Sequence, residues 1–179
     1  MSMPNPLAAI NNYKQVSAKH KIMKPKKDSP GVYPPPPLFY VVIFFFSILL
    51  QHYISISNDF FEGYVSHYLA PILIGLGALS ILPALITFFK SKNTLVTILP
   101  AKSLQTKGIY SISRNPMYLG LLFIYSGIGL IKGNWWTFIL IPLVIFVINQ
   151  LVIIKEENYL ERAFGKEFLD YKCNVRRWI

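Results

Sequence analysis

Gly108-Ile109-Tyr110-Ser111-Ile112-Ser113-Arg114-Asn115-Pro116-Met117-Tyr118-Leu119-Gly120 is a polar, basic stretch that runs directly into an apolar helix of membrane-spanning type. Polar and charged side chains are costly to place at the edge of a bilayer, so their presence there indicates a use. A carboxylate pair, Glu156-Glu157, stands at the end of the next apolar run. We therefore expect a helical hairpin whose two polar ends build one site at the membrane face.

Long apolar blocks predict an all-α integral membrane protein with about four transmembrane helices. Hydrophobic residues make up 53% of the 179, which exceeds the usual share in a soluble domain. A bilayer core of roughly 30 Å needs about 20 helical residues. The third block is short for this, so its helix is expected either to begin near Ile109 or not to cross fully. The blocks are residues 38–54, 65–89, 117–131 and 135–154, the last of which contains Pro142.

The basic residues are segregated along the chain and predict its topology. Six lysines lie before the first block, none of the 18 Lys and Arg residues lies between the first two blocks, and six follow the fourth block. The positive-inside rule then predicts a multi-pass protein with both termini cytoplasmic. The net charge of +10 is expected to favour anionic membrane lipids as partners and not nucleic acid. Residues 1–37 are expected to be a flexible, basic, Pro-rich tail, and residues 38–179 the membrane domain.

Helical spacing continues after the fourth block. Apolar residues recur at steps of three and four from Leu160 to Trp178, with basic residues between them. Such a segment can lie in the plane of the membrane interface. Gly165 is the position at which this helix is expected to kink or divide.

The Arg114-Asn115-Pro116 sequence is typical of a helix start, with Asn115 as the cap and Pro116 as the first helical residue. One reading is a capped membrane helix whose arginine reaches the interface. The other is a site for an anion, because a helix N-terminus presents free amides and a positive dipole end.

Two further features admit two readings each. Glu156 and Glu157 either begin a solvated helix or place one acid under the bundle, since adjacent helical residues diverge by about 100°. Tyr110 and Tyr118 are either an interfacial belt or an aromatic wall for a sulfonium or ammonium cation. No metal is expected, because His20, His52 and His67 are dispersed and lack metal-ligand spacing.

Taken together, Gly108–Gly120, the apolar hairpin, Glu156-Glu157 with Leu160, Phe164 and Gly165, and a Val-Arg-Arg-Trp end resemble a known superfamily. This is the isoprenylcysteine carboxyl methyltransferase and phospholipid methyltransferase superfamily, and the chain looks most like its small prokaryotic branch. The resemblance covers roughly residues 90–179.

The resemblance implies a membrane methyltransferase that uses S-adenosyl-L-methionine (SAM) and a lipid or lipid-modified, isoprenylcysteine-like acceptor. It also implies a cytosol-facing SAM pocket closed by the C-terminal helices. By position, the cofactor contacts would be Lys102, Ser103, Leu104, Gln105, Tyr110, Asn115, Pro116, Met117, Tyr118 and Glu156. Candidate substrate contacts are Arg114, Asn149, Lys155 and Glu157.

The chain departs from the isoprenylcysteine enzymes at two positions. Those enzymes commonly carry His where Asn115 stands, and an arginine assigned to substrate recognition where Val152 stands. These departures weaken the expectation of a prenylcysteine acceptor more than the expectation of the SAM cofactor. They leave open whether the methylated group is a carboxylate, an amine or a thiol. The alternatives are an NADPH-dependent sterol-type membrane reductase and a non-catalytic membrane adaptor.

Overall fold

A computed structural model describes residues 30–90 and 103–179, and every regular element within these two ranges is helical. The expectations for the tail before residue 30 and for Lys102 lie outside the described residues. Three long helices come first along the chain: α2 (Pro37–Tyr53), α3 (Tyr64–Lys90) and α4 (Pro116–Lys132). Two short 3-10 turns accompany them: η1 (Asp59–Glu62) before α3 and η2 (Gly108–Ser111) before α4. Helix α4 thus begins at Pro116, as the motif predicts, and not near Ile109.

The fourth apolar block is divided into several helical pieces. It forms α5 (Trp135–Ile139), α6 (Ile141–Ile148), a π-helical turn η3 (Asn149–Ile153) and the start of α7 (Ile154–Phe164). The first break falls at Leu140, two residues before Pro142, because proline has no amide hydrogen to continue an α-helical ladder. The apolar block over residues 135–154 is therefore helical along most of its length but not one regular α-helix.

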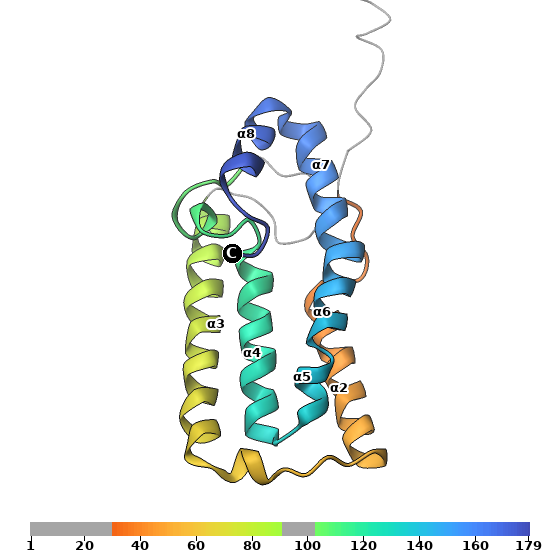
Figure 1. The fold of residues 1–179 in the computed structure, drawn as a ribbon. Coiled ribbons are helices and arrows are strands. Elements are labelled where there is room, and N and C mark those ends of the chain that lie inside the picture. The colour runs from red at the N-terminus through yellow and green to blue at the C-terminus, as the bar shows by residue number, and fades with distance from the viewer. Residues whose placement is uncertain (1–29, 91–102) are drawn as a thin grey trace, which may run out of the picture.

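Helix α7 extends beyond the bundle, and α8 (Lys166–Asn174) folds back over the end of the bundle (Figure 1). Gly165 separates the two helices with a φ of 53°, in the left-handed region that favours glycine. The expected division at Gly165 is confirmed. Val175 and Trp178 were expected on the same helix, but α8 ends at Asn174 and Val175 is extended. The final residues are thereby free to run across the top of α4 (Figure 1).

Helices α3 and α4 pack side by side and antiparallel (Figure 1). Glycines allow this close approach: a Cβ added to Gly120 would lie 2.5 Å from Ile81 Cγ1 and 2.8 Å from the carbonyl oxygen of Gly77. A Cβ added to Gly127 would meet Ile74 Cγ1 at 2.8 Å. Small residues at such contacts let two helix backbones approach. Gly120 and Gly127 therefore serve helix packing.

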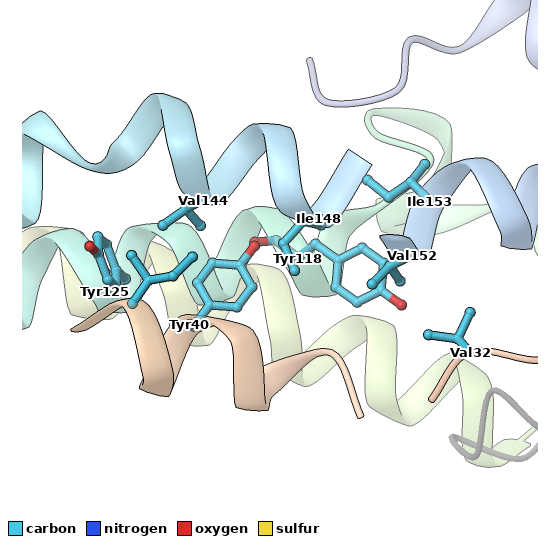
Figure 2. Packing of buried hydrophobic residues seen from close by; sticks show 9 residues of the cluster. Val32, Tyr40, Tyr118, Tyr125, Val144, Ile148, Val152 and Ile153 are labelled. Carbon is cyan, nitrogen blue, oxygen red and sulfur yellow. The ribbon is translucent and has the colours of Figure 1, made fainter. Parts of the chain in front are cut away.

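A cluster of buried apolar side chains joins α2, α4, α6 and η3 (Figure 2). Val144, Ile148 and Val152 have no exposed surface, and Tyr118 and Tyr40 pack against them. The Tyr40 hydroxyl also donates a 2.9 Å hydrogen bond to the backbone carbonyl of Tyr118. The cluster includes Val32, from the segment that precedes α2, at 2% exposure. This core holds the start of α4 against α2 and η3.

One helix among the described residues is long and apolar enough to cross a membrane, over Ser66–Lys90 within α3. Helices α2 and α4 are also apolar but shorter, at 17 residues each. Many large apolar side chains on α2 and α3 are exposed, including Phe45 at 62% and Leu79 at 67%. The bundle thus presents an apolar outer surface.

Candidate functional site

A cavity of about 340 Å³ lies at the end of the bundle where α4 begins and α7 starts. This volume lies in the range of small-molecule sites. Nearly all cofactor positions expected from the sequence line it: Ser103, Leu104, Gln105, Tyr110, Asn115, Pro116, Met117, Tyr118 and Glu156. Three separate segments of the chain therefore converge on one space.

Glu156 stands on the first turn of α7 and is partly buried. Its Oε1 accepts a 2.7 Å hydrogen bond from the Tyr118 hydroxyl on α4. Burial raises the pKa of Glu156 from 4.5 to about 7, against the opposing effect of the Tyr118 hydrogen bond, and the neighbouring Glu157 raises it further. Near neutral pH this carboxyl group can therefore exist in either protonation state.

Glu157 also lines the cavity but has different partners. Arg114 Nη2 lies 3.0 Å from Glu157 Oε1, and Arg177 donates from Nε at 3.0 Å and from Nη2 at 2.7 Å. Glu157 is 7% exposed. Both glutamates therefore reach the cavity wall, although only one had been expected there. Glu157 is an ion-pair centre, whereas Glu156 is bound to a neutral hydroxyl.

The extended C-terminal residues are fastened across the start of α4. The Arg114 amide donates to the Arg176 carbonyl at 3.1 Å, and Asn115 Nδ2 donates to the Arg177 carbonyl at 3.0 Å. Asn115 holds the cap position, but its side chain makes no capping hydrogen bond. The predicted cap position of Asn115 is therefore confirmed, but its side chain bonds to the C-terminal segment and not to the first-turn amides.

Aromatic side chains form much of the cavity wall. Tyr171 donates a 2.6 Å hydrogen bond to the Tyr110 carbonyl. Burial raises the pKa of Tyr171 to about 12, with Arg114 acting in the opposite direction. Tyr110 is 6% exposed, and burial together with the charges of Tyr171 and Glu156 raises its pKa. The Tyr110 hydroxyl is therefore neutral at physiological pH, and it finds no hydrogen-bond partner among the described residues.

The structure separates two of the expected substrate contacts from the cavity. Asn149, in η3, accepts a 3.2 Å hydrogen bond from Trp178 Nε1. Lys155 is exposed on the outer side of α7. Neither is among the described residues that line the cavity, whereas Arg114 and Glu157 are. Asn149 thus anchors the C-terminal segment, and both placements differ from the expectation.

Sequence reasoning assigned no site role to several residues that the structure brings to the cavity. Tyr159, Phe168 and Tyr171 line it from α7 and α8, and Arg177 completes the ion pairs of Glu157. The apolar spacing after Leu160 identified a buried helical face but not what that face covers. The sequence signal for Arg177 was the acid pair itself, because a glutamate that becomes buried requires a cation as its partner.

A model of the family described as phospholipid methyltransferase matches residues 65–167, more than half of the chain. An uncharacterized protein of Haemophilus influenzae is 46% identical over 63 residues, which are 35% of this chain and 100% of that protein. Protein-S-isoprenylcysteine O-methyltransferase B of Arabidopsis thaliana is 30% identical over 122 residues, covering 65% of this chain and 62% of the plant enzyme.

Protein-S-isoprenylcysteine O-methyltransferase of Schizosaccharomyces pombe is 33% identical over 72 residues, covering 40% of this chain and 30% of the yeast enzyme. The chain thus spans less than two thirds of either curated enzyme. No solved structure is a significant match. The family match extends from α3 to the first two residues of α8, and so it includes the start of α4 and all of α7. The chain belongs to the phospholipid methyltransferase family.

Proposed function

We propose that this protein transfers a methyl group from SAM to a lipid or lipid-modified acceptor at the membrane face. The observation that carries the proposal is the convergence of residues 103–105, the Asn115–Tyr118 segment and Glu156 on one cavity. These are the segments in which the family resemblance implies cofactor contacts. Membership of a methyltransferase family supports the same reaction class.

The residues of the cavity fit the chemical groups of SAM. The Glu156 carboxylate can accept hydrogen bonds from a ribose diol or pair with an ammonium group. The aromatic rings of Tyr118, Tyr159 and Phe168 offer faces to an adenine ring or to a sulfonium cation. The buried Tyr110 hydroxyl has an unused donor. When bound, SAM would supply a methyl group on a positively charged sulfur.

The contribution of this chain to methyl transfer is binding, orientation and exclusion of water. Such positioning can supply up to roughly 7–11 kcal/mol of acceleration in ideal cases. A carboxylate acceptor needs no base. An amine acceptor must lose a proton, and Glu156, whose pKa is about 7, could take it only if it did not hold the cofactor. Glu157 is engaged by two arginines, and the Tyr118 hydroxyl already donates to Glu156.

An apolar groove supports a lipid-chain acceptor. The groove, of about 230 Å³, runs between α2 and α4 and is lined by side chains such as Phe44, Ile124 and Tyr125. It shares Pro37 and Leu121 with the cavity, so the two spaces adjoin. An acyl or prenyl chain could lie in the groove while its polar end enters the cavity.

The membrane topology remains part of the proposal. Helices of 17 residues are about 26 Å long and approach the roughly 30 Å of a bilayer core. The start of α4, the α7–α8 segment and the C-terminus lie at one end of the bundle (Figure 1). Six Lys and Arg residues follow Ile154, so the positive-inside rule assigns that end to the cytoplasm. We propose a multi-pass protein with both termini on that side.

Calorimetric titration of the detergent-purified full chain with S-adenosylhomocysteine, the stable product form of the cofactor, tests the proposal. Saturable binding of this nucleoside without binding of NADPH is the expected result. Binding of NADPH alone would favour the reductase alternative. A folded protein that binds neither ligand would favour the adaptor.

A further inference from the structure

A cluster of charged side chains beside the cavity contains two arginines and one carboxylate that pairs with both. Arg114 and Arg177 both pair with Glu157, at N···O distances of 3.0 Å and 2.7 Å. Two guanidinium groups thus share one carboxylate. Glu156, the other acid on the wall, is hydrogen-bonded to Tyr118. The cluster of Arg114, Glu157 and Arg177 therefore has a net charge of +1.

Of the two arginines, Arg114 is the more buried, and it is the one that has unused buried hydrogen-bond donors. Its side chain is 10% exposed, whereas that of Arg177 is 34% exposed. Only Nη2 of Arg114 bonds to Glu157, and Nε and Nη1 find no partner among the described residues. Leaving buried donors of a charged group unpaired costs more than leaving neutral ones unpaired. Arg114 is also among the residues that line the cavity.

The guanidinium is also held in place before any ligand binds. The Arg114 amide is bonded to the Arg176 carbonyl, and the Nη2 contact with Glu157 fixes the far end of the side chain. The start of α4 lies beside it, and the Asn115 side chain caps none of the first-turn amides. A helix N-terminus adds a positive dipole end to the same region.

We infer that Arg114 forms an anion subsite in this cavity, which binds a carboxylate or phosphate group of a ligand through Nε or Nη1. The inference rests on the proposed function and deepens it. The anion has two possible sources: the amino-acid carboxylate of the methyl donor or an anionic head of the acceptor.

The first arm of the test compares S-adenosylhomocysteine with its decarboxylated analogue, which keeps the nucleoside and the amine but lacks the carboxylate. The full-length wild type should bind the carboxylate form about tenfold to a hundredfold more tightly, the range for a hydrogen bond to a charged group. Arg114→Gln should remove this preference and leave the affinity for the analogue unchanged. Arg177→Gln removes the same charge but no unused buried donor, so it should retain the preference.

The second arm compares an S-farnesylcysteine carboxylate with its neutral amide, titrated in neutral detergent. A preference for the carboxylate that Arg114→Gln abolishes would assign the anion to the acceptor. Arg114→Lys keeps the charge and should retain part of the preference, which supplies a second variant if the glutamine form fails to fold.

The inference is overturned if a folded Arg114→Gln protein weakens the charged and uncharged members of both pairs equally, because Arg114 then acts only through Glu157. It is also overturned if the wild type shows no preference in either pair. A wild type that binds neither nucleoside would instead overturn the proposed function, and the anion subsite with it.

Discussion

The Tyr118 hydroxyl donates a 2.7 Å hydrogen bond to Oε1 of Glu156, and this contact joins the first turn of α4 to the first turn of α7. The Tyr118 backbone carbonyl accepts from Tyr40 on α2. Three helices thus meet at one edge of the cavity, and the two polar ends of the last hairpin are in direct contact.

Glu156→Gln should weaken the binding of S-adenosylhomocysteine by about 1.5–3 kcal/mol, the range for a hydrogen bond to a charged group. The variant keeps the shape of the side chain and loses its charge. Calorimetric titration measures the difference, and the melting temperature of the variant checks its folding. If Glu156→Gln binds normally while a folded Glu157→Gln fails, the cofactor role belongs to the other acid.

The stability of the ligand-free protein should fall as pH rises from about 4.5 to about 7. Glu156 has a pKa of about 7 in the folded state against 4.5 as its ordinary value, so the folded state binds more protons than the unfolded state across this window. The free energy of unfolding then decreases with pH, by up to about 1.4 kcal/mol per unit from this group. Below the window the group contributes no pH dependence.

Thermal unfolding of the wild type and of Glu156→Gln across pH 4.5–7 measures this slope. The glutamine variant cannot titrate, so the difference in melting temperature between the two proteins should grow in its favour as pH rises. Parallel curves for the two proteins would mean that the buried carboxyl group does not retain its proton.

Glu157→Gln should destabilise the protein by about 3 kcal/mol, because it leaves the buried Arg114 without its counter-charge. Arg177→Gln should cost less, since Glu157 keeps Arg114 and the Arg177 side chain is 34% exposed. Denaturation of both variants in the same detergent gives the comparison. Equal losses, or a larger loss for Arg177→Gln, would show that Glu157 is not the centre of the cluster.

Gly120→Ala should destabilise the α3–α4 contact by about 1–3 kcal/mol, the usual cost of overpacking. The new Cβ would lie 2.8 Å from the Gly77 carbonyl oxygen, which is backbone and cannot rotate away. Gly75→Ala is the matched control on α3, because its Cβ would have nothing within 4 Å. The control should melt at or above the wild-type temperature. A stable Gly120→Ala protein would contradict the close packing of the two helices.

Local patterns in the sequence indicated which residues would lie together at the cavity, but they did not predict the bounds of every element that encloses it. Asn115, Pro116, Met117 and Tyr118 are consecutive, and Pro116 fixes the start of α4, so local rules were sufficient to place these residues together. Glu156 and Glu157 follow an apolar run that forms the second half of a hairpin. The chain therefore returns to the end of the bundle where α4 begins. The positions of both motifs could therefore be inferred from short-range patterns.

Long-range contacts were the part that local patterns could not supply. The Asn115 amide bonds to a carbonyl 62 residues away, although its sequence neighbourhood is typical of a cap. Trp178 continues the helical spacing of α8, but its indole bonds to Asn149 and the backbone there is not helical. In both cases a polar contact with a residue far away in the sequence determines the local structure. Hydrophobic periodicity does not reveal such distant partners.

A structure of the full chain with bound S-adenosylhomocysteine in a lipid nanodisc tests the central claim most directly. The account predicts that the side chains of Asn115 and Glu156 both contact the same nucleoside, between the start of α4 and the start of α7. A nucleoside bound elsewhere, or in contact with one of these two segments while the other stays remote, would contradict it.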